Sequence, residues 1–158
     1  MSNLSFYVHI PYCVKRCGYC DFNTYTPNEL REGGTLEKVS EGFIDSLIAE
    51  VTFAARTNST TIPTIFFGGG TPSLIPAKEL GRVIDLLKQR WEFTPDIEIT
   101  MECNPDTLSL QSLEEYRAIG VNRISIGMQS ANPNVLKVLD RTHNPDNVAK
   151  SVVNARKA

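Results

Sequence analysis

Short apolar runs alternate along the chain with longer segments of helical periodicity. The runs are rich in β-branched and aromatic residues, which is typical of buried strands, and they occupy residues 6–10, 64–67, 97–101 and 122–128. Apolar residues at a spacing of three or four positions predict helices over residues 40–56, 76–91, 110–119, 132–139 and 146–157. Pro76 suits a first helical turn, and Gly120 suits a helix C-terminus. The pattern therefore predicts four βα units in series.

Strands that alternate with helices predict right-handed crossovers and a parallel sheet, either open and doubly wound or closed as a barrel. No GxGxxG sequence opens the first helix, which disfavours a dinucleotide-binding fold. A parallel sheet of four strands would leave an edge and helix faces uncovered. We therefore expect an α/β chain in which residues 1–158 form the N-terminal part of a longer barrel-like protein.

Length and charge narrow the classes of function. A chain of 158 residues with 41% hydrophobic content can bury one core. Its 16 basic and 18 acidic residues leave a net charge of −2 without a Lys/Arg block, so nucleic acid is not an expected partner. The N-terminus lacks the pattern of a signal peptide, and no apolar run reaches about 18 residues, so we expect a cytoplasmic protein.

Three of the four cysteines crowd into the loop after the first predicted strand. Cys13, Cys17 and Cys20 are spaced C-x3-C-x2-C, which suits three thiolate ligands of a cubane iron–sulfur cluster with one iron left open. In a reducing compartment, clustered cysteines bind metal or do chemistry more often than they form disulfides. A zinc site completed by His9 or Cys103 is one alternative, although no second cysteine pair is present. A second alternative is that the three cysteines are buried and bind no ligand.

Other distinctive residues follow the remaining strands. The sequence GGGTP (68–72) follows the second strand, Glu102 closes the third and Gln129 closes the fourth. In α/β barrels, catalytic and ligand-binding groups gather at the carboxyl ends of the strands. We therefore expect these features and the cysteine loop to meet in one site. Cys103 and His143 are interpreted as structural residues.

The cysteine motif resembles the signature of the radical S-adenosylmethionine (SAM) superfamily. The ordered blocks YVHIPYCVKRCGYCDF, IFFGGGTPSLI, MECNPDTL, GVNRISIGMQS and LDRTH resemble the family of HemW-type heme chaperones and oxygen-independent coproporphyrinogen III oxidases. The resemblance implies a partial (β/α)6 TIM-type barrel, of which this chain would cover about the first four units of the radical SAM core domain. It also implies a [4Fe-4S] cluster on the three cysteines and SAM, whose sulfonium is cleaved by one electron from the cluster.

The same resemblance implies contacts to SAM. Gly69, Gly70 and Thr71 would meet the methionine ammonium, because absent side chains let backbone carbonyls approach a cation. Arg141 would pair with the methionine carboxylate through its bidentate fork. The further implied contacts are Tyr7, Tyr19 on the adenine side, Glu102 and Gln129.

Phe22 separates two branches of the family. The oxidases typically carry a cysteine two residues after the third ligand, whereas the chaperones carry phenylalanine there. Phe22 therefore favours a heme chaperone that binds heme or a porphyrin and passes heme to an acceptor protein, which could be membrane-associated. The alternative is an enzyme of porphyrin biosynthesis that decarboxylates coproporphyrinogen III. Heme-binding residues are expected beyond residue 158, and neither the acceptor nor the electron donor follows from the sequence.

Overall fold

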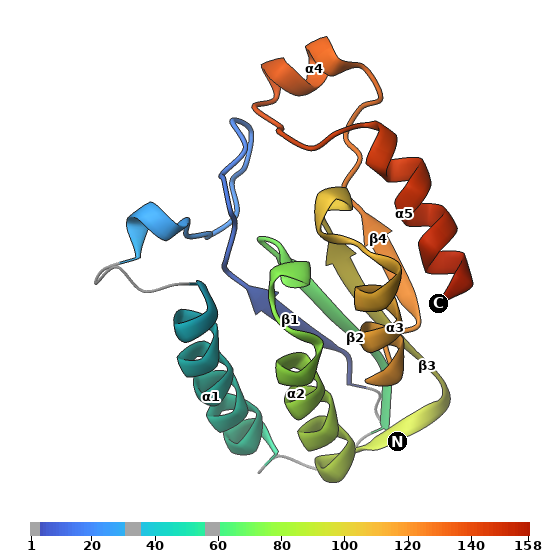
Figure 1. Ribbon diagram of the computed structural model, residues 1–158. Coiled ribbons are helices and arrows are strands. Elements are labelled where there is room, and N and C mark those ends of the chain that lie inside the picture. The colour runs from blue at the N-terminus through green and yellow to red at the C-terminus, as the bar shows by residue number, and fades with distance from the viewer. Residues whose placement is uncertain (1–3, 31–35, 56–60) are drawn as a thin grey trace.

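Strands and helices alternate along the chain in the computed structural model, which describes residues 4–30, 36–55 and 61–158 (Figure 1). The strands are β1 (Phe6–Ile10), β2 (Thr61–Gly69), β3 (Glu92–Cys103) and β4 (Arg123–Ile126). The α-helices are α1 (Leu36–Ala54), α2 (Ala77–Arg90), α3 (Leu110–Ala118), α4 (Pro133–Val138) and α5 (Asp146–Lys157). Short 3-10 turns follow three of the strands, namely η1 (Pro27–Glu29), η2 (Pro72–Leu74) and η3 (Pro105–Thr107).

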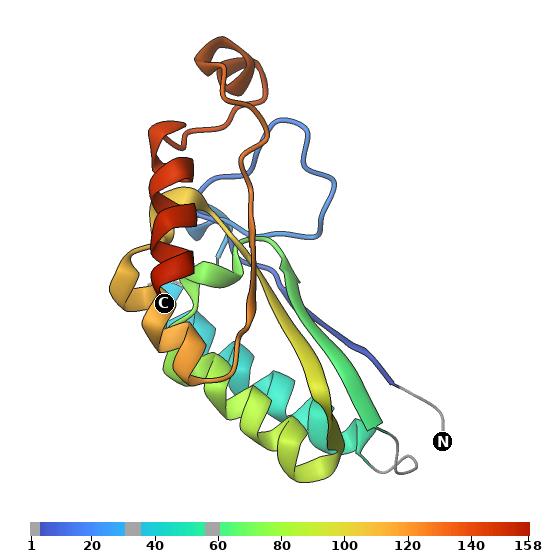
Figure 2. The same ribbon diagram turned by 90° about the vertical axis from the view of Figure 1, so that its right-hand side faces the viewer.

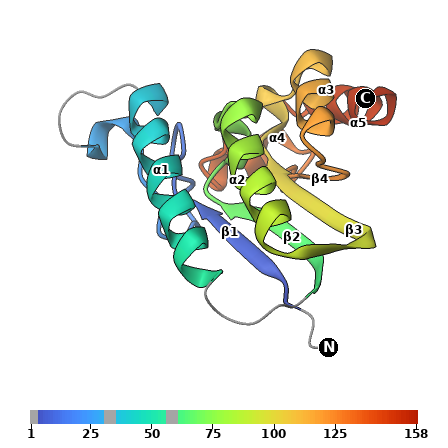
Figure 3. The same cartoon turned by 90° about the horizontal axis from the view of Figure 1, so that it is seen from below.

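The four strands form one parallel sheet in the order β1-β2-β3-β4, so the predicted α/β class with parallel crossovers is confirmed. The main helices lie on one side of this sheet, as the view along its edge shows (Figure 2). From below, α1 and α2 lie next to each other over β1 and β2, and α3 and α5 lie beside β3 and β4 (Figure 3). No helix within the described ranges is long and apolar enough to cross a bilayer.

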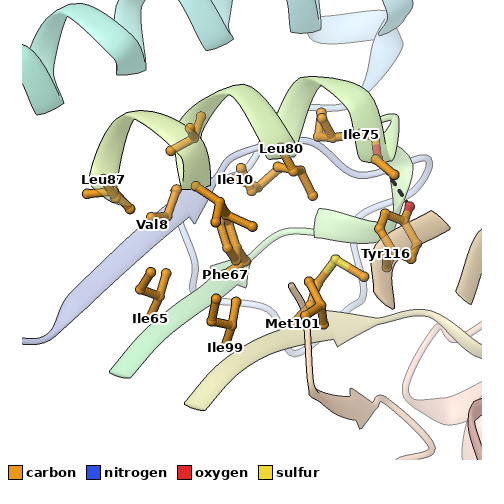
Figure 4. Close-up of a cluster of buried hydrophobic side chains, with 14 of the residues drawn as sticks. Val8, Ile10, Ile65, Phe67, Ile75, Leu80, Leu87, Ile99, Met101 and Tyr116 are labelled. Carbon is orange, nitrogen blue, oxygen red and sulfur yellow. Dashed lines mark hydrogen bonds between the residues drawn. The ribbon is translucent and has the colours of Figure 1, made fainter. Parts of the chain in front are cut away.

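The core lies between the sheet and its helices, because alternate strand residues point toward α2 (Figure 4). The strand residues of this layer are at most 3% exposed and are Val8, Ile10, Ile65, Phe67, Ile99 and Met101. Leu80 and Leu87, one face of α2, are fully buried opposite them. Each such burial contributes roughly 1.5–3 kcal/mol. This layer fixes the strand order and the position of every strand end.

The other face of the sheet carries polar groups. Thr100 pairs in register with Phe66 of β2 and with Arg123 of β4. Its hydroxyl donates to Oε1 of Glu98 at 2.9 Å, and Arg123 Nη1 donates to the same oxygen at 2.8 Å. Because strand side chains alternate, Tyr7, Phe66 and Thr100 lie in one row across this face.

Except for β1, the strands differ in length from the predicted ones. β4 is shorter than its predicted residues 122–128, whereas β2 and β3 are longer than predicted. β2 begins three residues before the predicted residues 64–67, and the register shifts around Pro63, which has no N–H to donate. β3 begins at Glu92, five residues before its apolar run, since pairing with β2 extends the strand into polar sequence. The first predicted helix begins earlier, at Leu36, and its predicted last residue, Arg56, lies outside the described residues. Gly120 follows α3 with φ of +106°, as predicted for a helix C-terminus.

Candidate functional site

The carboxyl ends of the four strands border one cavity of about 750 Å³. This volume falls within the range of sites that hold small organic ligands. Every residue predicted for the site except Tyr7 lines the cavity, namely Cys13, Cys17, Tyr19, Cys20, Gly69, Gly70, Thr71, Glu102, Gln129 and Arg141. The sheet topology thus brings together groups that lie far apart in the sequence.

The cysteine loop rises from the end of β1 and is closed at its base by backbone hydrogen bonds (Figure 1). Cys13 N donates to Tyr25 O at 3.0 Å, and Tyr25 N donates to Pro11 O at 2.6 Å, so the two legs of the loop run together. Within the loop, Cys20 N donates to Cys17 O at 3.1 Å in a tight turn. The paired legs and the turn hold three free thiols along one wall of the cavity.

Hydrogen-bond donors approach two of these sulfurs. Thr71 Oγ1 donates to Cys13 Sγ at 3.7 Å, and Arg141 Nη1 donates to Cys17 Sγ at 3.3 Å. Burial raises the pKa of the Cys13 thiol, and the neighbouring Cys20 and Cys17 also raise it, whereas Thr71 acts against them. Among the described residues, no group of three or more His, Cys, Asp or Glu side chains is arranged around a single metal ion. Three free thiols with donors directed at two of them fit the donor set of an iron–sulfur cluster.

The glycine loop packs tightly against the end of β1. Gly70 N donates to Ile10 O at 2.7 Å, and a Cβ on Gly70 would lie 2.5 Å from Tyr12 O. Gly69 has φ of +108°, and a Cβ there would lie 2.6 Å from the His9 ring. The sequence predicts glycines here because absent side chains let a ligand approach the backbone. The structure shows that the protein itself requires them, because any side chain would collide with β1 or with the cysteine loop.

Glu102 and Tyr7 lie on the polar face of the sheet near Gly68. A Cβ on Gly68 would lie 3.0 Å from Glu102 Oε2 and 3.0 Å from the Tyr7 ring. Glu102 lines the cavity, whereas Tyr7 is 55% exposed outside the lining, with its hydroxyl 3.3 Å from His9 Nδ1. Burial and the charge of Glu102 raise the pKa of Tyr7. The His9 ring also contacts the cysteine loop, since its Nε2 lies 2.9 Å from Asn23 O.

Gln129 and Asp140 hold the left-handed backbone conformation, with φ of 58° and 54°. Within the described ranges they are the non-glycine residues with positive φ, and both line the cavity. Such a conformation costs a residue with a side chain roughly 1–2 kcal/mol, and strain of this kind clusters at functional sites. The strained backbone aims Gln129 at the cavity, where its Nε2 would lie 3.8 Å from a Cβ on Gly127.

The segment Leu139, Asp140 and Arg141 contacts the cysteine loop at three points, and we call these contacts the clasp. Gly18 N donates to Leu139 O at 3.2 Å, Lys15 forms an ion pair with Asp140, and Arg141 donates to Cys17. Sequence reasoning missed the clasp. Its partners are up to 125 positions apart, so no local spacing marks it.

Cys103 and His143 are both buried, as their structural interpretation predicts. Cys103 Sγ donates to Met101 O at 3.6 Å, and burial raises the pKa of the thiol to about 12, although the residue also reaches the cavity lining. His143 is 4% exposed, and no side chain forms a hydrogen bond with its ring nitrogens. Burial and the charge of Arg141 lower the pKa of His143, while Asp106 and the backbone of Met128 act in the opposite direction.

Comparisons with a family model and with curated sequences agree on one family. Residues 7–158 match the model of the Radical SAM superfamily. The chain is 40% identical over 150 residues to heme chaperone HemW of Mycobacterium tuberculosis H37Rv, covering 94% of this chain and 37% of that protein. It is 38% identical over 148 residues to heme chaperone HemW of Escherichia coli K12, covering 94% of this chain and 38% of that protein. The chain thus spans less than two fifths of the length of these relatives.

Comparison with solved structures supports the fold. Coproporphyrinogen III oxidase (HemN) from Escherichia coli, described as a radical SAM enzyme, matches with a TM-score of 0.84 and 28% identity over 97% of this chain and 34% of that chain. The archaeal Elp3 of Methanocaldococcus infernus shares the fold with a TM-score of 0.51 at 17% identity, over 74% of this chain and 32% of that chain. The predicted partial barrel of about four βα units is confirmed.

Proposed function

The chain belongs to the radical SAM superfamily, and from this premise we propose that its cavity binds a [4Fe-4S] cluster and SAM. The observation that carries the proposal is the convergence of Cys13, Cys17 and Cys20 with the glycine loop and Arg141 around one cavity. When bound and reduced, such a cluster supplies the electron that cleaves the sulfonium of SAM. The residues of the chain hold, orient and shield these groups.

Each residue predicted for the site has a role in this proposal. The thiolates of the three cysteines hold the cluster. The guanidinium of Arg141 pairs with the methionine carboxylate, and the loop Gly69, Gly70 and Thr71 faces the methionine ammonium. The other residues proposed to contact SAM are Glu102, Gln129, Tyr19 against the adenine and Tyr7 from beyond the cavity lining.

We further propose that the protein is a cytoplasmic heme chaperone, which binds heme or a porphyrin and transfers heme to an acceptor protein. The curated relatives named heme chaperone HemW support this function at 38–40% identity. Phe22 supports it as well, since it lines the cavity at the position where the oxidases of this family carry a further cysteine. In this proposal residues 1–158 are the N-terminal portion of the radical SAM core domain, and the acceptor could be membrane-associated.

Decarboxylation of coproporphyrinogen III is a second candidate function. The structural likeness to HemN, with a TM-score of 0.84 over 97% of the chain, favours it. The two candidates share the cluster and SAM, so they differ only in what happens to the porphyrin. Phe22 is the residue of this chain that favours heme transfer over decarboxylation.

Anaerobic reconstitution with iron and sulfide tests the cluster. We expect about four irons per chain and a broad absorption near roughly 400 nm, as for a cubane cluster. A colourless protein that retains zinc instead would overturn the proposal. Equilibrium binding of SAM to the reconstituted protein tests the second ligand, and binding that is independent of the cluster would contradict a shared site.

Porphyrin chemistry separates the two candidate functions. The natural full-length protein is incubated with heme, and in parallel with coproporphyrinogen III, SAM and a reductant. Heme binding followed by transfer to an apo-hemoprotein, without decarboxylation, is expected. Formation of protoporphyrinogen would instead establish the oxidase.

A further inference from the structure

We propose that Arg141 sets the reduction potential of the bound cluster by donating a hydrogen bond to the ligating sulfur of Cys17. The inference rests on the proposed cluster site and goes beyond the carboxylate contact proposed for this residue. In this proposal the guanidinium of Arg141 affects the reduction potential of the cluster even when SAM is not bound. Arg141 is thus a positioning residue for the electron transfer.

The geometry of Arg141 is that of a fork between two acceptors. Nη1 donates to Cys17 Sγ at 3.3 Å, and Nη2 donates to Gly127 O at 2.7 Å. Nε is buried and has no partner, and Nη1 and Nη2 each keep a second N–H group, so donors remain for a carboxylate in the cavity. Planar N–H groups on one rigid frame hold both bonds at once.

The backbone on both sides of this contact is fixed by the clasp. Gly18, next to Cys17, is bonded to Leu139 O, and Lys15 is paired with Asp140. Asp140 adopts φ of 54°, a costly conformation for a residue with a side chain, immediately before Arg141. A Cβ on Gly18 would lie 3.4 Å from Asp140 Cβ, so the space between the two segments would be filled by a single methyl group. The other clasp contacts therefore hold the cysteine loop and the backbone of Arg141 close together, whether or not the bond to Cys17 is present.

Electrostatics gives the sign of the effect. Reduction adds one negative charge to the cluster and its thiolates, so a cationic donor stabilises the reduced form more than the oxidised form. Hydrogen bonds to cluster sulfurs and burial of the site are known determinants of the potential. The groups that donate to Cys13 are the neutral hydroxyls of Thr71, at 3.7 Å, and of Thr24. The cationic bond to Cys17 is therefore the stronger influence, and it raises the potential.

The test compares three variants of the natural full-length protein, reconstituted under anaerobic conditions. Arg141→Gln removes both the charge and the fork. Arg141→Lys keeps the charge but replaces the fork by a point charge that reaches one acceptor at a time. Lys15→Gln is the matched control, because it removes a charge and one clasp contact from the same loop while Arg141 keeps both of its donors. Iron content is measured first, and the midpoint potential is then determined by EPR-monitored redox titration without SAM.

We expect Arg141→Gln to disfavour reduction by about tenfold, which is a fall of about 59 mV for one electron. Arg141→Lys should lie between this variant and the unaltered protein, and Lys15→Gln should shift the potential by less than half as much. An unchanged potential in Arg141→Gln, or an equal fall in Lys15→Gln, overturns the inference. If Arg141→Gln does not retain iron, the nitrogen coupling described next decides, because lysine at this position can still donate one bond to Cys17.

A spectroscopic readout addresses the contact itself. In protein labelled with ¹⁵N-arginine, pulsed EPR of the reduced cluster should detect a hyperfine coupling to nitrogen that Arg141→Lys loses. Absence of the coupling from the unaltered protein would refute the contact. A protein that binds no cluster at all refutes the proposed function instead, so the two failures are distinct.

Discussion

The backbone N–H of Gly69 donates a hydrogen bond to Oε2 of Glu102 at 3.2 Å, which ties the end of β2 to the end of β3 in the cavity wall. The two strands are paired in register up to Phe67 and Met101, so the sheet places this carboxylate directly beside the glycine loop. A carboxylate that accepts a backbone N–H is held in position by that bond.

Glu102→Gln should separate position from charge. The amide oxygen can still accept the Gly69 N–H, so the thermal midpoint should stay within about 2 °C of the unaltered value. Loss of the charge should raise the Kd for SAM about tenfold, or about 1.4 kcal/mol, in calorimetry of the reconstituted protein. Glu98→Gln is the control, because Glu98 lies on the same strand and binds Arg123 outside the cavity. Equal losses of affinity in both variants would remove Glu102 from the site.

Cys17→Ala should abolish the cluster, since two thiolates cannot hold a cubane that also keeps an open iron. Iron analysis after reconstitution should fall from about four per chain to background. Cys103→Ala is the matched control, because burial raises the pKa of the Cys103 thiol to about 12 and keeps it protonated. Normal iron content in Cys17→Ala, or its loss in Cys103→Ala, would contradict the ligand assignment.

Gly70→Ala should destabilise the fold itself. Its Cβ would lie 2.5 Å from the backbone oxygen of Tyr12, and a backbone atom cannot move aside as a flexible side chain can. We expect the free energy of unfolding in urea to fall by about 2 kcal/mol or more. Gly42→Ala in α1 meets no atom within 4 Å and should instead stabilise the protein by about 0.5–1 kcal/mol. Similar stabilities for the two variants would show that the glycine loop is not tightly packed.

His143 should make stability depend on pH. Burial lowers its pKa below the usual value near 6.5, so the unfolded chain binds the proton more readily than the native protein. The contribution is therefore present above about pH 6.5 and is lost as the pH falls toward the native pKa, with a slope of at most about 1.4 kcal/mol per pH unit. Urea unfolding between about pH 7.5 and 5.5 measures it. His143→Gln should flatten this slope, and an unchanged slope would assign it to other groups.

Local patterns were sufficient to predict the helices, the parallel sheet and the convergence of the strand ends. They did not predict the strand order, because they are equally compatible with an open doubly wound sheet and with a barrel. The periodicity of α5 and the apolar run of β1 match the structure residue for residue, because each depends on its own amphipathic or β-branched pattern. The polar start of β3 at Glu92 was not predictable, since only pairing with β2 makes those residues a strand.

The sequence was sufficient to predict which residues form the site, but not which contacts their side chains make. Chain order and a parallel sheet are enough to bring Cys13, Gly70 and Glu102 to one edge. They do not reveal how deep each side chain lies, and Tyr7 proves to be more than half exposed beyond the cavity lining. Nor do they reveal the collision of a Gly69 side chain with His9, which depends on the side-chain position of another strand.

The clasp also sets an order of events during synthesis. Cys17 and Arg141 are 124 positions apart, and a ribosome adds roughly 5–20 residues per second, so the thiols precede their clasp by about 6–25 s. Throughout that interval the cysteine loop is accessible from the side that residues 139–141 later close. Closure of the loop by Asp140 and Arg141 therefore waits until the chain has been synthesised past β4.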